Sequence, residues 1–228
     1  MTVQFRHSSR NPAAGIGLRQ KTASLPAYYT RSFCRSCNGG WMSRLEEHVR
    51  PVLEPLMLGH ESTLTATEQQ TLALWSTKTM LAFQSIEDQQ TRFARDEDFR
   101  RLYSLMAPLP YGQVWLGANV HGEAGWYRAH SIRLPTSAAN AIDGFGAMLS
   151  VGFAVLYGVF LFDGASQLRL LGDGAFVLLE LGAREDELLW PPPLPLQEVN
   201  LTGLPEALMR RSRLVQKTDP LAGETEAS

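Results

Sequence analysis

Cysteine is scarce in this chain of 228 residues, which contains only two. They are Cys34 and Cys37, in a C-x-x-C spacing, so a framework of several disulfides is excluded. The first thirty residues also lack the apolar segment of a secretory signal peptide. Without such a signal, the spacing favours metal or redox chemistry over a structural disulfide, and we expect a cytoplasmic protein.

A large net charge is also lacking, because 21 basic and 23 acidic residues give a formal value of −2. The charges are nevertheless unevenly placed. Residues 1–50 hold eight Lys or Arg against two Glu, a local balance of +6, and the remainder carries −8. This asymmetry is typical of a basic segment that faces nucleic acid on an acidic body, and equally of a basic leader without fixed structure.

One segment is long and uncharged, from Phe145 to Phe162. Its length approaches that of a membrane-spanning helix. However, it contains Gly146, Gly152 and Gly158, and its second half is β-branched and aromatic. We therefore expect the end of a short helix followed by a buried strand over 153–162, and no membrane span.

Capping boxes predict two helices in the first half of the chain. Ser43-x-x-Glu46 opens the first, which Pro51 and Pro55 should kink or shorten. Thr65-x-x-Glu68 opens the second, which should run to about Gln89. A third helix is expected from Asp96 to Met106, ending before two prolines.

From Gly112 the pattern changes to that of strands. Residues 113–120 and 125–134 predict a hairpin around the turn 121–123. A helix is expected over 137–148, and further strands over 153–162, 167–171, 176–180 and 187–190. The order predicts an α+β fold with a mostly antiparallel sheet. Its expected parts are a basic, poorly structured leader (1–30), a knuckle plus helical region (31–110), a sheet region (111–211) and a disordered tail (212–228).

The cysteine pair is the main candidate for a functional motif. Two thiolates in C-x-x-C spacing suit one tetrahedral Zn²⁺, but a structural zinc needs four ligands and the chain has no third cysteine. His48 is the nearest histidine, so the candidate metal ligands are Cys34, Cys37 and His48. The alternatives are a surface histidine, two small buried side chains without metal, and a redox pair at a helix start.

The run Cys34-x-x-Cys37-Asn38-Gly39-Gly40-Trp41-Met42-Ser43-x-Leu45-Glu46 resembles bacterial and phage proteins related to HNH endonucleases. In that group, C-x-x-C-N-x-G-W-M-S-x-L-E follows an N-terminal C-x-x-C and a Glu-His pair. The segment from Thr65 to Lys78 with Trp75, and Trp190-Pro191-Pro192, are also similar. The resemblance covers residues 31–90 well and the rest loosely.

The resemblance implies a structural zinc on four cysteines, a histidine general base and Mg²⁺ for nuclease activity. Cys34 and Cys37 match the second zinc pair, whereas the first pair and the Glu-His motif have no counterpart. This departure favours a natural protein that begins upstream of Met1, or a degenerate member. A third alternative is a homodimer in which two C-x-x-C turns share one zinc.

We therefore expect an HNH-endonuclease-like protein that binds nucleic acid and is incomplete or catalytically inactive as written. The candidate nucleic-acid-binding residues are Arg31, Arg35 and Arg44, and Trp41 either stacks on a base or covers the knuckle core. The alternative is a non-catalytic scaffold or interaction protein with a vestigial knuckle.

Overall fold

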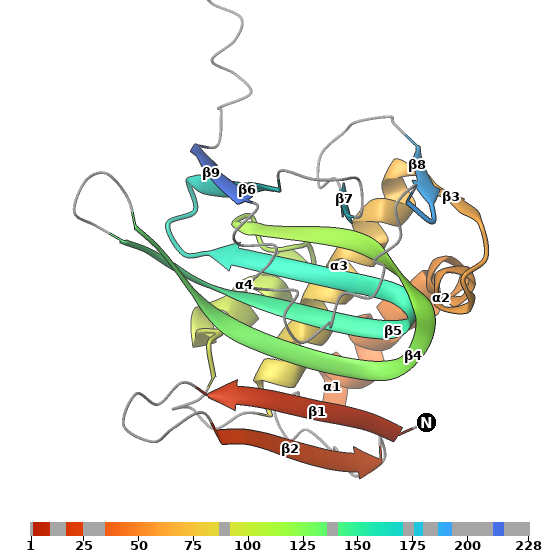
Figure 1. Ribbon diagram of the computed structural model, residues 1–228, viewed down its shortest axis with the longest axis horizontal. Coiled ribbons are helices and arrows are strands. Elements are labelled where there is room, and N and C mark those ends of the chain that lie inside the picture. The colour runs from red at the N-terminus through yellow and green to blue at the C-terminus, as the bar shows by residue number, and fades with distance from the viewer. Residues whose placement is uncertain are drawn as a thin grey trace, which may run out of the picture.

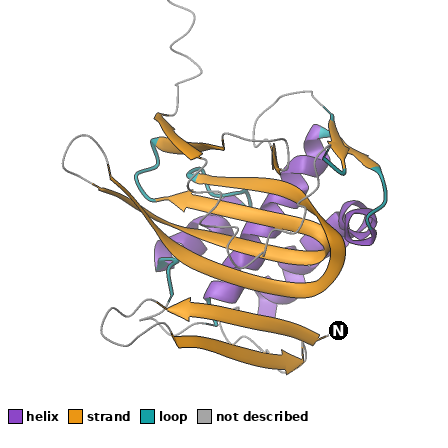
Figure 2. Cartoon of the chain, viewed as in Figure 1, coloured by secondary structure: helices purple, strands orange, loops and turns teal. Residues whose placement is uncertain are grey.

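The computed structural model describes residues 2–9, 17–24, 35–86, 92–135, 141–170, 176–179, 187–192 and 212–216 (Figure 1). The described helices lie on one face of a sheet (Figure 2), which confirms the α+β prediction. They are α1 (Arg35–Cys37), the π-helical turn η2 (Asn38–Met42), α2 (Ser43–Leu58), α3 (Ala66–Gln84) and α4 (Asp96–Leu105). Among these residues, no helix is long and apolar enough to cross a membrane.

The main sheet has the strand order β2-β1-β4-β5, and β7 pairs with the first part of β4. All its pairs are antiparallel except β1 with β4. Its strands are β1 (Thr2–Ser9), β2 (Gly17–Ser24), β4 (Gly112–Pro135), β5 (Ala141–Leu161) and β7 (Phe176–Leu179). Two small antiparallel sheets join β3 (Ser62–Leu64) to β8 (Leu188–Trp190), and β6 (Ser166–Leu170) to β9 (Ser212–Gln216).

The predicted hairpin around residues 121–123 is wrong, because β4 continues through it as one long strand. The strand β5 pairs with β4 along its whole length, so the two form a ribbon that bends back on itself (Figure 1). The register shifts between Ala118 and Trp126, where the ribbon bends. Gly122 and Gly152 have positive φ values of 55° and 60° at this bend. Gly122 therefore marks a bend within β4 rather than a turn between two strands.

The helix expected over 137–148 is also wrong for residues 141–148, which begin β5. Gly144 and Gly146 explain the difference. A Cβ atom at Gly144 would lie 2.3 Å from the carbonyl oxygen of Phe160, and one at Gly146 would lie 2.4 Å from the His130 ring. Close packing around two glycines overrides the helix-favouring alanines of this segment. The strand predicted over 153–162 is confirmed as the second part of β5.

Regular structure also occurs at both ends of the chain, where the sequence predicts little. β1 and β2 form an antiparallel ladder between residues 2 and 24, and β1 joins β4 in the main sheet. Near the C-terminus, β9 pairs with β6. The expectation of a poorly structured leader and a disordered tail is therefore wrong for β1, β2 and β9. The strands β4 and β6 with which β1 and β9 pair are remote in the sequence, and the register of β1 with β2 cannot be recognised from short polar segments. Residues 217–228 lie outside the described part.

The core lies between α2, α3 and the ribbon. Leu72, Met80 and Leu81 of α3 are completely buried, as are Leu116 of β4 and Leu156 of β5. The helix α2 continues through Pro51 and Pro55 for 16 residues, so the predicted shortening is wrong. Five apolar side chains on one side of α2 are buried, and this packing offsets the two missing backbone hydrogen bonds.

Candidate functional site

The segment expected to form the knuckle consists of α1 and η2, with a backbone kink at Gly40, and runs directly into α2. Ser43 has helical backbone angles and does not cap α2, so the predicted capping box is wrong. Glu46 instead accepts a hydrogen bond from Trp75 Nε1 at 2.9 Å and pairs with the buried ammonium group of Lys78. The start of α2 is therefore tied to α3, and the segment before it is held at that end.

Only part of the predicted metal site lies in the described residues. Cys37 is disulfide-bonded, and Cys34 lies outside them. His48 is exposed on α2, and its Nδ1–H donates to the Arg44 carbonyl at 2.6 Å, which leaves Nε2 for other contacts. Within the described ranges, no three His, Cys, Asp or Glu side chains are grouped to hold a metal. Zinc requires thiolates, so a zinc site on the reduced pair stays a prediction.

The predicted nucleic-acid-binding arginines are described to different extents. Arg44 is exposed in the first turn of α2. Arg35 begins α1, although its side chain is not among those described, and Arg31 lies outside the described residues. Trp41 is partly buried and packs against the hydrophobic core. Its Nε1–H is buried and has no hydrogen-bond partner.

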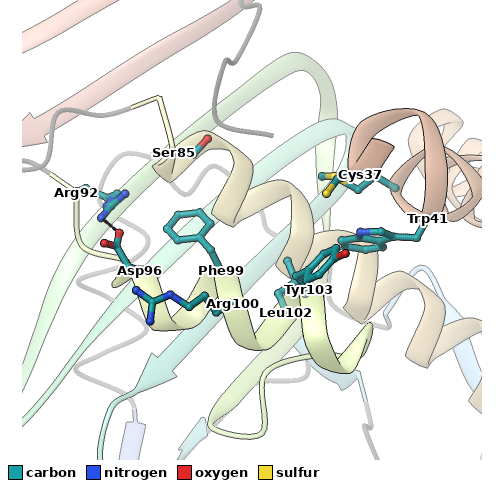
Figure 3. A pocket seen from close by; sticks show the side chains of 10 residues that line it. Cys37, Trp41, Ser85, Arg92, Asp96, Phe99, Arg100, Leu102 and Tyr103 are labelled. Carbon is teal, nitrogen blue, oxygen red and sulfur yellow. Dashed lines mark hydrogen bonds and ion pairs between the residues drawn. The ribbon is translucent and has the colours of Figure 1, made fainter. Parts of the chain in front are cut away.

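A cleft of about 610 Å³ opens between this segment and α4 (Figure 3). Trp41 and Met42 of η2 line it from one side, together with Cys37. Phe99 and Tyr103 of α4 line it from the other. Met42 is buried and Tyr103 is 54% exposed, so the cleft has an apolar floor and an open aromatic rim. Its volume is in the range of small-molecule sites in proteins.

Two arginines give this cleft its charge. Arg92 pairs with Asp96, and its guanidinium carbon lies 5.3 Å from the centre of the Phe99 ring. Arg100 is exposed at the rim and has no ion pair within the described part of the chain. The cleft therefore combines aromatic faces with one guanidinium group that is free to meet an anion.

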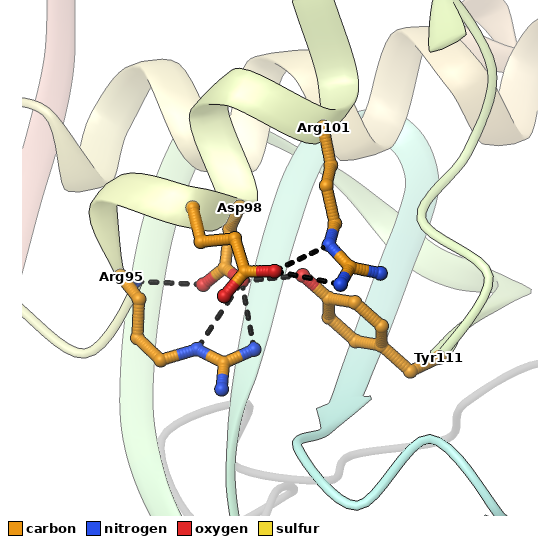
Figure 4. A network of polar contacts seen from close by, with 5 residues as sticks. Arg95, Asp98, Arg101 and Tyr111 are labelled. Atoms are coloured by element: carbon orange, nitrogen blue, oxygen red, sulfur yellow. Dashed lines mark hydrogen bonds and ion pairs between the residues drawn. The ribbon is translucent and has the colours of Figure 1, made fainter. Parts of the chain in front are cut away.

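The helix α4 that forms this wall is fixed to the sheet by a buried network (Figure 4). Asp98 is completely buried; it accepts hydrogen bonds from the Arg95 backbone N–H at 2.7 Å and from the Arg95 guanidinium at 3.1 Å. The hydroxyl of Tyr111, just before β4, donates to the same carboxylate. The Arg95 guanidinium also lies 3.9 Å from the centre of the Phe162 ring, beyond the end of β5.

This network changes the pKa values of Tyr111 and Arg95. Burial, followed by the hydrogen bond to Asp98, raises the pKa of Tyr111. Burial lowers the pKa of Arg95, but the hydrogen bond and the attraction to Asp98 outweigh it, so the pKa of Arg95 is raised overall. At neutral pH, Tyr111 is therefore a neutral hydrogen-bond donor and Arg95 a cation. The network is a structural anchor that positions the α4 wall of the cleft.

Sequence reasoning identified Trp41 and Cys37 on one wall but missed Phe99, Arg100 and Tyr103 on the other. The helix itself was predicted correctly, since α4 spans Asp96–Leu105 and the expected range was 96–106. The spacing of these residues, three and four apart, places them on one side of the helix. Aromatic and basic residues on one side of a helix were the signal that could have indicated a binding surface. The opposite wall of the cleft comes from a segment more than fifty residues earlier, so the sequence does not show that the two segments meet.

We compared the chain with family models, with curated proteins and with solved structures, and none of them matches it.

Proposed function

We propose that this protein binds nucleic acid through the face that carries the cleft and the start of α2. The cleft supports the proposal because it places Trp41, Phe99 and Tyr103 beside Arg100, which has no ion pair with any residue that the structure describes. Bases stack on aromatic side chains, and guanidinium groups bind phosphate oxygens. Arg44 adds an exposed positive charge two residues after Met42.

The resemblance to HNH-related proteins supports the same function. We propose binding only and assign no catalytic base. Mg²⁺ would be needed only for a nuclease activity, which we do not propose for these residues. Structural zinc on the reduced Cys34–Cys37 pair, a homodimer that shares such a zinc, and a cytoplasmic location remain compatible with it.

The test is the salt dependence of DNA binding, followed by fluorescence anisotropy with labelled oligonucleotides. The double variant Arg35→Glu plus Arg44→Glu should weaken binding more than about tenfold at low salt. It should also reduce the slope of log K against log salt by about 2, because two phosphate contacts are lost.

A matched control is available on the sheet. Arg133→Glu changes the same charge on β4, where the Arg133 side chain is 78% exposed. It should weaken binding less than Arg44→Glu alone. Absence of salt-dependent binding to any oligonucleotide, or equal effects of the two single variants, would contradict the proposal.

A second candidate function is protein–protein interaction. It is favoured by the end of α4, where Tyr103, Leu105 and Met106 are all at least half exposed. Clustered apolar side chains of this kind often mark an interaction surface. The absence of nucleic-acid binding at low salt would favour this candidate over the first.

A further inference from the structure

We propose that the cleft holds one unpaired base of a single-stranded nucleic acid, with the base against Trp41 and Tyr103 and a neighbouring phosphate on Arg100. This inference rests on the proposed function and names its substrate class. It adds a defined binding position to a general affinity for nucleic acid.

The walls of the cleft suit a flat ring. Trp41 and Tyr103 approach it from two separate segments, η2 and α4 (Figure 3). The buried apolar side chains of Met42 and Leu102 also line it. Base–aromatic stacking contributes about 1–3 kcal/mol per base and does not depend on sequence. An aliphatic ligand would fill the same volume without using the aromatic faces.

The charges of the cleft suit a single phosphate. Arg92 is already paired with Asp96, so its charge is largely neutralised. Arg100 lies one helical turn beyond Asp96 and carries no such partner among the described residues. A guanidinium group offers several donors in a plane, which matches two oxygens of a phosphate.

A base in a duplex cannot enter this site, because both of its faces are covered by its neighbours in the stack. The unpaired base of a single strand exposes a face. Trp41 gives a second indication, since its buried Nε1–H has no acceptor within the described chain. An unsatisfied buried donor costs about 1–3 kcal/mol, and a ligand oxygen that reaches this N–H past the edge of the indole, beside the stacked base, would remove that cost.

The experiment compares a labelled oligothymidylate, an oligouridylate and a mixed-sequence DNA duplex in anisotropy titrations with the full chain. Tyr103→Ala and Arg100→Ala should each weaken binding of the single strands about tenfold. Both should change duplex binding less than twofold. Leu105→Ala and Arg133→Ala are the controls; they remove an equally exposed apolar side chain on α4 and an exposed arginine on β4, and they should leave single-strand binding unchanged.

The outcomes separate the two proposals. Wild-type binding to duplex but not to single strands would overturn the unpaired-base site and leave the proposed function intact. Equal losses for single strands and duplex in Tyr103→Ala would do the same. If no oligonucleotide binds at low salt, the proposed function itself fails. A tenfold loss confined to one sugar type supports the site and identifies its natural strand as DNA or RNA.

Discussion

The bend of the β4–β5 ribbon and the cleft beside α4 are built in opposite ways. At the bend, backbone packs against backbone: a Cβ atom on Gly152 would lie 2.2 Å from the carbonyl oxygen of Met57 in α2. At the cleft, side chains such as Tyr103 and Arg100 extend toward solvent and make few contacts that the fold requires. The backbone at the bend therefore leaves no room for a larger side chain, whereas the side chains at the cleft can be replaced without a clash.

The two regions should therefore respond differently to substitution. At the bend, a substitution should change the free energy of unfolding because no neighbour can move aside. At the cleft rim, a substitution should change binding and leave stability almost unaltered. Stability and binding measurements on matched variants can therefore test the comparison directly.

The largest effect is expected for Gly152→Ala. The new methyl group would meet the Met57 carbonyl, and the φ value of 60° is unfavourable for alanine. We expect a loss of about 4 kcal/mol in the free energy of unfolding, measured by urea denaturation, or failure to fold.

Gly164→Ala is the matched control for this variant. Its φ value is 69°, but no atom lies within 4 Å of the added Cβ. It should lose only about 1 kcal/mol. Equal losses in the two variants would mean that the positive φ value alone determines the loss in the free energy of unfolding. The close contact between α2 and the bend would then contribute nothing to it.

A smaller effect is expected for Asp98→Ala, which removes the carboxylate that fixes α4 to the sheet. The buried Tyr111 hydroxyl and the Arg95 backbone N–H would then lose their acceptor, and the partly exposed Arg95 guanidinium would lose its ion pair. The expected loss is about 3 kcal/mol in urea denaturation. Glu97→Ala removes a neighbouring carboxylate that pairs with Arg101 at the surface, and it should cost clearly less than Asp98→Ala because water screens the exposed pair. A similar loss for both variants would show that α4 is not held by the buried network.

Local signals in the sequence predicted elements well only where the local interaction survives in the fold. Thr65 and Glu68 form the capping box that the sequence predicts, and α3 begins there. Ser43 and Glu46 present the same motif, yet Glu46 turns to Trp75 and Lys78 on α3. The two motifs are of the same type, but Ser43 follows η2 with helical backbone angles, whereas Thr65 is extended and can cap α3.

The same limit applies to the bend and to the cleft. A glycine at position 122 indicates a turn as readily as a bulge, and only the pairing with β5 distinguishes them. The sequence predicts no cleft. It singles out Trp41 within a recognisable run, whereas Phe99 and Tyr103 become its neighbours only because α4 is fixed by Asp98. Site residues that come from separate segments require the packing of the whole fold.

The smallest effect on stability is expected at the cleft rim, and it is the sharpest test of the comparison. Tyr103→Ala and Arg100→Ala should each change the free energy of unfolding by less than about 0.5 kcal/mol, because both side chains are exposed. Leu102→Ala, next in sequence but only 2% exposed, should lose about 3 kcal/mol in the same urea titration. A loss above about 1.5 kcal/mol for Tyr103→Ala would make its ring part of the core. Any weaker binding of that variant would then reflect a disturbed fold, whereas intact stability with a tenfold loss of single-strand binding places the role of Tyr103 in recognition.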